Sequence, residues 1–272
     1  MLTVLSLLLG GYLLICVLLY FRQESLIFYP TRESEAALQD LARRSGFESW
    51  KTSDGKSIGW VSKQGDPSRA LLVFHGNAGH ALMRSYLASL PDPDGQGWRV
   101  YVLEYPGYGA REGETSEKTL VAAGVQAVDE LSHSGVKKIW ILGESLGTGV
   151  ASQVAGLRPT LVTGVILLTP FDSLSHAAAA HYPWLPTQWL IRHTFDSAAA
   201  LKKYPGPVAF LVAGQDSVVP ARLGQRLFDE RDGPKRLWIA PDADHNDGAL
   251  LMGNWPEVAD WLRQNSISPL LP

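Results

Sequence analysis

The sequence predicts an α/β domain built on a mostly parallel central sheet. Between residues 30 and 265, short β-branched or aliphatic runs alternate with amphipathic stretches, which is the rhythm of strands joined by crossover helices. Most of the short runs are continuously apolar, as strands buried on both faces should be. No repeat, low-complexity tract or long linker interrupts this rhythm.

The composition fits one folded unit of ordinary size. Of the 272 residues, 46% are hydrophobic and 19% are charged, so a sizeable core can be buried and disorder is excluded as the main state. The net charge is −3 and no basic block stands out, which argues against a nucleic-acid partner. The single cysteine, Cys16, allows neither an internal disulfide nor a C-x-x-C metal or redox site.

Residues 2–21 predict a membrane-spanning helix. This run contains no charged side chain, and at about 1.5 Å rise per residue it measures roughly 30 Å, the thickness of a bilayer core. A cleaved signal peptide is the alternative, but a basic n-region is missing and the run ends in bulky residues. We therefore expect a retained single-pass anchor followed by one domain over residues 22–272. Arg22 and Arg32 favour a cytoplasmic domain only weakly, so the side of the membrane stays open.

Seven strands and four main helices are expected along the chain. The first strand run follows the Asp-Gly turn at residues 54–55. The expected strand runs are 58–62, 70–74, 100–104, 138–142, 164–169, 208–213 and 236–240. The helical stretches are 116–132, 146–157, 221–229 and 255–264. Residues 171–204 are too long for a simple connection, so they predict an insertion with structure of its own.

The motif at residues 143–147 places a serine between a predicted strand and a predicted helix. It reads G-E-S-L-G and fits the pattern G-x-S-x-G. A serine in such a sharp turn has a strained backbone, and a side chain at Gly143 or Gly147 would crowd the turn. The helix that follows aims backbone N–H groups at the same place, where they can stabilise an oxyanion. Ser145 is therefore the candidate nucleophile, and the alternative is a glycine-rich turn with an idle serine.

The segment H-G-N-A-G at residues 75–79 directly follows an early strand. A loop in this place can supply a second donor to an oxyanion. We expect the backbone N–H groups of Asn77 and Leu146 to act together, each worth roughly 10² to 10³ in rate. The alternative is a turn whose glycines merely permit close packing. His75 is expected to be a structural histidine.

A serine hydroxyl needs a base, and in this chain order the base should follow the last strand. His245 lies there, in the loop 241–247 ahead of the final helix. The other six histidines fit less well, because they lie on helical or turn segments, in the insertion or ahead of the serine: His75, His80, His133, His176, His181 and His193. His245 is therefore the candidate base.

An acid must hold the imidazole tautomer, and it should lie after a strand between the serine and the histidine. Asp216 meets both conditions, in the turn 214–220. Asp172 is the rival, one strand earlier in the chain. Either aspartate could instead simply cap the next helix.

These motifs make the chain resemble the α/β-hydrolase superfamily. The residues that carry the resemblance are 75–79, the E-Y-P-G-Y-G run at 104–109, 143–147, 214–220 and Asp-His at 244–245. Within the superfamily the chain is most similar to the single-pass, bud-emergence-type hydrolases. That branch is related to membrane-associated depalmitoylases, and its members are described as serine aminopeptidases or lysophospholipases. The resemblance implies an α/β-hydrolase fold in which residues 171–204 form a cap after the sixth strand.

The insertion is rich in apolar side chains. Its apolar set is Phe171, Tyr182, Trp184, Leu185, Trp189, Leu190, Ile191 and Phe195. These residues could line an acyl pocket or meet a lipid surface, and could equally pack the cap onto the sheet. The candidate substrate-binding residues are Phe171, Tyr182, Trp184 and Trp189. An anchor that places the cap near the bilayer favours lipid-like esters.

The resulting hypothesis is a membrane-anchored serine hydrolase that cleaves ester or thioester bonds of acyl substrates through an acyl-enzyme. Ser145 attacks, His245 takes its proton and Asp216 orients the histidine, so neither a metal nor an organic cofactor is required. The nearest alternative is a serine peptidase, and an aminopeptidase would need a carboxylate near the pocket, for which Glu144 is a candidate. An alternative of another class is a catalytically silent, membrane-tethered scaffold, which the intact set of three side chains argues against.

Overall fold

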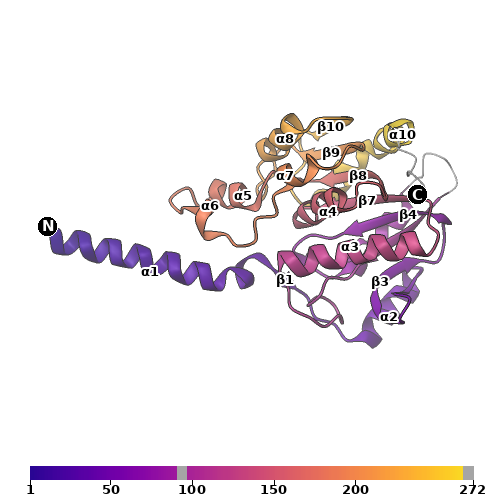
Figure 1. Ribbon diagram of the computed structural model, residues 1–272, viewed down its shortest axis with the longest axis horizontal. Coiled ribbons are helices and arrows are strands. Elements are labelled where there is room, and N and C mark those ends of the chain that lie inside the picture. Colours follow the sequence, from indigo (N-terminus) through magenta and orange to yellow (C-terminus); the bar gives the residue numbers. More distant parts are fainter. Residues whose placement is uncertain (91–96, 266–272) are drawn as a thin grey trace.

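The computed structural model describes residues 1–90 and 97–265. A long helix, α1 (Leu2–Ile27), extends from a domain in which helices cover both faces of one large sheet (Figure 1). The α/β prediction is confirmed. The apolar helix runs six residues beyond the predicted segment 2–21, and it ends where Phe28 turns to extended backbone ahead of Pro30.

The large sheet has eight strands in the order β10-β9-β8-β7-β4-β6-β3-β2. The strands are β2 (Phe47–Lys51), β3 (Ser57–Ser62), β4 (Asp66–Phe74), β6 (Trp98–Leu103), β7 (Lys138–Glu144), β8 (Val162–Leu168), β9 (Val208–Ala213) and β10 (Lys235–Ala240). Only β3 pairs antiparallel with its neighbours on both sides; the strands from β6 to β10 run parallel. All seven predicted strands are present, and β2 at the sheet edge is an additional one.

Helices pack on the two faces of this sheet. The longer ones are α2 (Glu35–Arg44), α3 (Glu117–His133), α4 (Leu146–Leu157), α8 (Ala221–Glu230) and α10 (Trp255–Asn265). The shorter ones are η1 (Ala81–Ser89), α9 (Gly248–Leu251) and η2 (Met252–Asn254). The four predicted helices are therefore found, whereas α2, which begins at an N-cap serine, Ser34, was not predicted.

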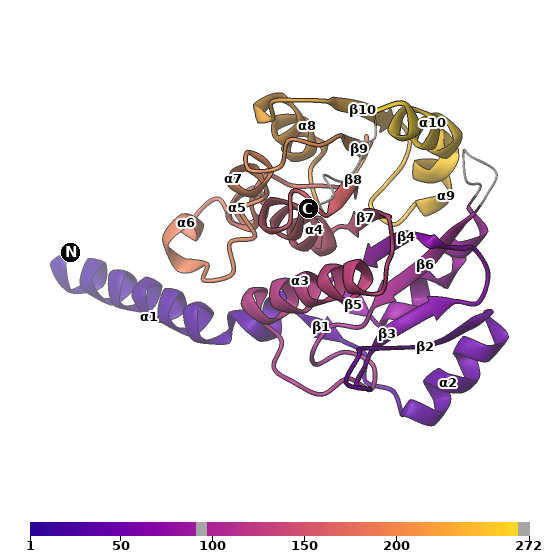
Figure 2. The same cartoon turned by 45° about the vertical axis from the view of Figure 1, so that its right-hand side comes forward.

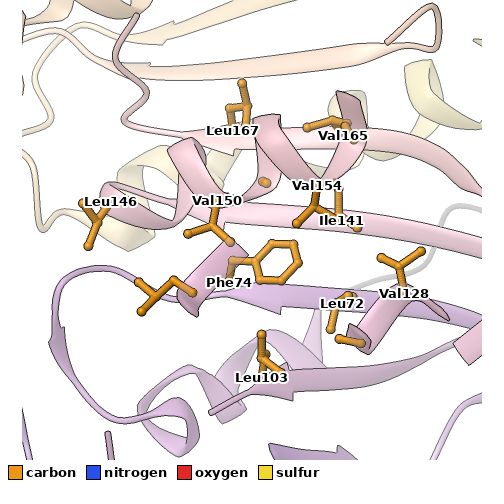
Figure 3. Close-up of a cluster of buried hydrophobic side chains, with 14 of the residues drawn as sticks. Leu72, Phe74, Leu103, Val128, Ile141, Leu146, Val150, Val154, Val165 and Leu167 are labelled. Atoms are coloured by element: carbon orange, nitrogen blue, oxygen red, sulfur yellow. The ribbon is translucent and has the colours of Figure 1, made fainter. Parts of the chain in front are cut away.

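Side chains of the central strands alternate between two hydrophobic cores. In β4, Leu72 and Phe74 pack with α3 and α4, whereas Leu71 and Val73 face α10 and η1 on the other side. Figure 3 shows Phe74 between the strand side chains and Val150 of α4. Because both faces are buried, the strands are apolar at nearly every position and their ends are held firmly at one edge of the sheet.

The insertion, residues 171–204, divides into two parts. Its second half returns to the domain, because Phe195 is fully buried and α7 (Ser197–Leu201) packs on α4. Its first half contains α5 (Leu174–His181) and α6 (Thr187–Leu190), which stand away from the sheet above α1 (Figure 2). We call residues 174–191 the cap segment.

The chain between α1 and the domain is tied to the loop after β4. Strand β1 (Tyr29–Pro30) pairs in parallel with β5 (Ala78–Gly79) as a separate two-stranded sheet. The last helical carbonyl of α1, that of Ile27, accepts a hydrogen bond from Asn77 Nδ2 at 3.1 Å. The end of α1 is therefore fixed to the segment that was predicted to carry an oxyanion donor.

Within the described residues, α1 is the one helix that is long and apolar enough to cross a membrane. Its most apolar stretch has a mean hydropathy of 2.6, and 6% of that stretch is buried against the rest of the chain. Length and composition are thus compatible with a bilayer-spanning helix.

Candidate active site

Ser145 stands on the turn between β7 and α4 in a strained conformation. Its φ is +51° and its ψ is −118°, a region that residues other than glycine rarely adopt. A Cβ atom on Gly143 would overlap the carbonyl oxygen of Gly147, and a Cβ atom on Gly147 would overlap that of Phe74. The predicted need for both glycines is therefore confirmed, because the turn passes directly against neighbouring backbone.

His245 faces Ser145 from the loop that follows β10. Its Nε2 lies 2.9 Å from the Oγ of Ser145, across a sequence separation of 100 residues. The His245 side chain is largely buried, with 9% of it exposed. Parallel strands bring their carboxyl ends to one edge of the sheet, so the loops after β7 and β10 meet there.

Asp216 holds the other nitrogen of the imidazole. The Nδ1 of His245 lies 2.8 Å from Oδ2 and 3.0 Å from Oδ1 of this carboxylate. Oδ1 also accepts the backbone N–H groups of Val218 at 2.9 Å and Val219 at 2.6 Å, so the carboxylate cannot turn away. This arrangement selects the tautomer with its proton on Nδ1 and leaves Nε2 free to accept the serine proton.

Asp172, the rival acid, lies in a different polar cluster. Its Oδ2 is 2.7 Å from the Nδ1 of His176 and 3.4 Å from the Nε of Arg226. Its Oδ1 accepts the backbone N–H of Ser173 at 2.7 Å. The structure thus brings Asp216, and not Asp172, to the candidate base.

Asp244 joins the loops that carry the acid and the base. Its Oδ1 accepts the backbone N–H groups of Ser217 at 2.8 Å and His245 at 2.7 Å, and also the Ser217 hydroxyl. The hydrogen bonds from the backbone N–H groups of Ser217 and His245 are the main cause that lowers the pKa of Asp244 below its ordinary value. This carboxylate was not expected to orient the imidazole, and it instead links the loop after β9 to the loop after β10.

The two residues expected to supply backbone donors to an oxyanion, Asn77 and Leu146, line the same cavity as Ser145. Leu146 is the first residue of α4, so its N–H has no partner within the helix. Asn77 follows β4, and its carbonyl accepts hydrogen bonds from the N–H of Tyr29 at 3.1 Å and the hydroxyl of Tyr108 at 2.8 Å. Tyr108 and β1 therefore fix the peptide between Asn77 and Ala78, and the peptide that carries the Asn77 N–H is contacted through its Gly76 carbonyl by His75 Nδ1 at 2.8 Å.

His75 is a buried structural residue, as expected. It is fully buried, and its Nδ1 lies 2.8 Å from the carbonyl oxygen of Gly76. Burial lowers the pKa of His75 to about 3, so its ring stays neutral at physiological pH. The hydroxyl of Tyr105 donates to the carbonyl of His75 at 3.0 Å, which holds the start of the loop 75–79.

Arg84 is a site residue that the sequence did not reveal. Its Nε donates to Oε2 of Glu144 at 2.8 Å, and its Nη2 donates to Oε1 at 2.6 Å. Both oxygens of Glu144, the candidate for binding a substrate amine, are thus engaged by one guanidinium. Arg84 comes from η1, 60 residues earlier in the chain, and no local pattern pairs these positions.

A cavity of about 790 Å³ opens in front of Ser145 and His245. Of the candidate substrate-binding residues, Phe171, Tyr182 and Trp184 line it. Trp189, by contrast, is 77% exposed and is absent from the lining. The physical reason is the shortness of α6: its four residues point in different directions, and the next residue, Leu190, faces the cavity instead.

One wall of this cavity comes from α1. The helix contributes Ile15, Leu19, Gln23, Leu26 and Ile27 to the lining. No sequence pattern assigns these residues to a pocket, since an uninterrupted apolar run predicts only contact with lipid.

Comparisons with known proteins agree with this architecture. The family model described as the alpha/beta hydrolase fold matches residues 69–201. An uncharacterised protein of Mycobacterium tuberculosis, strain H37Rv, is 34% identical over 245 residues, which cover 88% of this chain and 86% of that protein. The chain belongs to the α/β-hydrolase superfamily. The same relationship extends to lipases: lysophosphatidylserine lipase ABHD12 of Danio rerio is 29% identical over 204 residues, 66% of this chain and 52% of the lipase.

Solved structures share the fold of this α/β hydrolase. The esterase Pf2001 of Pyrococcus furiosus superposes with a TM-score of 0.60 at 17% identity, over 87% of this chain and 99% of the esterase. A monoacylglycerol lipase of Paleococcus ferrophilus gives a TM-score of 0.54 at 20% identity, over 75% of this chain and 98% of the lipase. The chain spans about half the length of ABHD12. These likenesses do not single out the bud-emergence-type branch, which stays a prediction.

Proposed function

We propose that this α/β hydrolase is a membrane-anchored serine esterase or lipase that cleaves ester or thioester bonds of acyl substrates. The observation that carries the proposal is the hydrogen-bonded series from Ser145 Oγ through both nitrogens of His245 to Asp216, at the floor of a largely apolar cavity. A nucleophile, a base and an orienting acid in this geometry are the arrangement that acyl transfer requires.

The reaction proceeds in two halves. Ser145 Oγ attacks the acyl carbon while His245 Nε2 takes its proton, and the resulting oxyanion accepts the N–H groups of Asn77 and Leu146. The leaving alcohol or thiol departs with the proton from His245, which leaves the acyl group on the serine. Water then attacks the acyl-enzyme as His245 takes its proton, and the free acid is released with the serine restored.

The lining of the cavity favours binding of the apolar acyl group of a substrate. Aromatic and aliphatic side chains of the cap segment and α1 form most of its lining. Relatives named as lysophosphatidylserine lipase and a structural neighbour named as monoacylglycerol lipase act on lipids with a single acyl chain. We therefore assign lipid-like acyl esters as the substrate class, and α1 as the anchor that keeps the enzyme at the membrane.

The peptidase alternative receives less support. Glu144 is the only carboxylate among the described residues that line the cavity, and Arg84 neutralises it through two hydrogen bonds. An aminopeptidase needs an unpaired negative charge for the substrate amine, and this side chain does not supply one.

A fluorophosphonate probe tests the proposal directly, because its phosphorus captures an activated serine with loss of fluoride. We expect the membrane-extracted wild type to be labelled and Ser145→Ala to stay unlabelled. A wild type that unfolds cooperatively on heating but is never labelled would favour the scaffold alternative. A series of ester, thioester and aminoacyl-amide substrates with the same acyl group then identifies the bond that is cleaved.

A further inference from the structure

One side of α1 is packed against the cap segment. Tyr12, Cys16, Leu19, Gln23 and Ile27 are less exposed than the residues around them, and their spacing of three or four residues defines one helix face. The opposite side of the helix remains open along its whole length. An anchor that served only as a tether would need no such face.

Polar contacts fix α1 to the cap segment at both ends of this face. The hydroxyl of Tyr12 donates to the carbonyl of Trp184 at 3.0 Å. Gln23, which is 6% exposed, donates from Nε2 to the carbonyl of Leu190 at 3.2 Å and accepts the N–H of Arg192 at 2.7 Å. From Tyr12 to Gln23 the helix rises about 16 Å, so the docked stretch is several turns long.

The space enclosed between α1 and the cap segment is continuous with the candidate active site. Ile15, Leu19 and Ile27 line the same cavity as Ser145 and His245. From Ile15 to Ile27 the helix rises about 18 Å, which gives the cavity a long apolar wall that leads away from the serine. A wall of this kind matches an extended alkyl chain better than a compact substrate.

The far end of this cavity lies beside the stretch of α1 that carries no charged side chain. Thirteen residues of α1, all uncharged, continue beyond Ile15 toward the N-terminus of the helix. The neighbouring segment 182–191 contains no charged residue, and its Tyr182, Trp184 and Trp189 side chains are more than half exposed. Exposed tryptophan and tyrosine in an uncharged segment are typical of a membrane interface. This accounts for Trp189, which faces outward and not into the cavity.

We propose that α1 is one wall of the acyl-binding site, and that the acyl chain of a bilayer lipid enters between Ile15 and Trp184 and lies along Leu19 toward Ser145. The inference rests on the proposed hydrolase function and adds a second role to the anchor: it selects substrates by acyl length. The substrate is therefore a membrane-resident lipid ester with a long acyl chain that enters sideways from the bilayer.

A photoreactive probe can trace the path of the acyl chain. The probe is a fluorophosphonate with a dodecyl chain that ends in a diazirine, applied to the full-length protein in lipid vesicles. After reaction and illumination, we expect cross-links to map to Ile15, Leu19 or the Trp184 region of the cap segment. Cross-links confined to Val218, Val219 and Asn246, which line the cavity from the loops after β9 and β10, would overturn the inference. Absence of the phosphonate adduct on Ser145 would instead contradict the proposed function.

A matched pair of variants tests selectivity independently. Leu19→Trp narrows the cavity beside α1. Leu14→Trp adds the same side chain about 140° around the helix, at an exposed position outside the cavity. We measure the ratio of kcat/KM for dodecanoyl and butanoyl esters, so a general loss of activity cancels. Loss of contact with two or more methylenes lowers this ratio about tenfold or more in Leu19→Trp. The ratio in Leu14→Trp stays near that of the wild type, and a ratio that is the same in all three proteins would overturn the inference.

Discussion

Replacement of Asp216 by asparagine is the sharpest test of the proposed chemistry. The Oδ1 of the new amide can still accept the N–H groups of Val218 and Val219, which bond Oδ1 of the carboxylate at 2.9 Å and 2.6 Å. Its NH₂ group then occupies the place of Oδ2, 2.8 Å from the Nδ1 of His245. Two donors cannot face each other, so the imidazole is driven to carry its proton on Nε2.

That tautomer cannot accept the proton of Ser145. The Nε2–H would point at Oγ across the present 2.9 Å contact, and the imidazolium formed during attack would also lose its carboxylate partner. A change of this kind lowers kcat by about 10⁴-fold where a serine, histidine and aspartate act as a unit. We therefore expect kcat for a soluble short-chain ester, and the rate of fluorophosphonate labelling, to fall in Asp216→Asn by about that factor.

Asp172→Asn is the matched control. The two carboxylates are buried alike, with 2% of the Asp172 side chain and 1% of the Asp216 side chain exposed, but Asp172 contacts His176 and Arg226. This variant should lose some stability and retain most of its labelling rate. The reasoning fails if Asp172→Asn slows labelling as much as Asp216→Asn, or if Asp216→Asn slows it less than about tenfold.

Three further predictions concern the turn, a buried carboxyl and the anchor. Gly147→Ala should abolish labelling and lower the melting temperature, because its Cβ overlaps the Phe74 carbonyl. Burial raises the pKa of Glu104 from 4.5 to about 7, so the folded protein favours the neutral acid. The contribution of this neutral carboxyl group to the free energy of unfolding is present below pH 4.5 and is lost as the pH rises to about 7. Glu104→Gln should therefore gain about 3 kcal/mol in unfolding free energy relative to wild type between pH 4.5 and pH 8, and a pH-independent difference would contradict this. Gln23→Leu leaves the N–H of Arg192 without its partner at a cost of about 1–3 kcal/mol, so hydrogen exchange at that amide should accelerate, whereas unchanged protection would show that the contact with α1 is dispensable.

The residues proposed for chemistry could be predicted because they depend on strand order more than on distance. Ser145, Asp216 and His245 each follow a predicted parallel strand, and the carboxyl ends of neighbouring parallel strands share one edge of the sheet. Local patterns sufficed to find β7, β9 and β10, because buried strands are continuous apolar runs. The structure separates Asp216 from its rival Asp172 by the same geometry, since the loop after β9 is adjacent to the loop after β10.

Features that depend on contacts between distant segments could not be predicted. The pairing of Arg84 with Glu144 joins η1 to the end of β7, and neither residue carries a signal for the other. The outward direction of Trp189 could not be predicted, because a four-residue helix has too few positions to show a periodic face. The edge strand β2 was missed for a related reason: its five residues mix charged and apolar positions and resemble a loop.

The role inferred for α1 shows why an apolar helix hides its function in the sequence. A lipid tail in the bilayer and an acyl chain in a cavity both require an apolar side chain beside them, so Leu14 and Leu19 have the same hydropathy although they face different surroundings.

What distinguishes the two sides of the helix is the placement of its few polar groups. Tyr12 and Gln23 lie eleven residues apart, which is close to three helical turns, and both bond to the cap segment. A glutamine two residues after an uncharged run would ordinarily mark only the end of the membrane segment. Here it is buried, and its two hydrogen bonds to the chain around Leu190 and Arg192 hold the cap over the helix, so that the apolar residues between the polar pair enclose a path from the bilayer to Ser145.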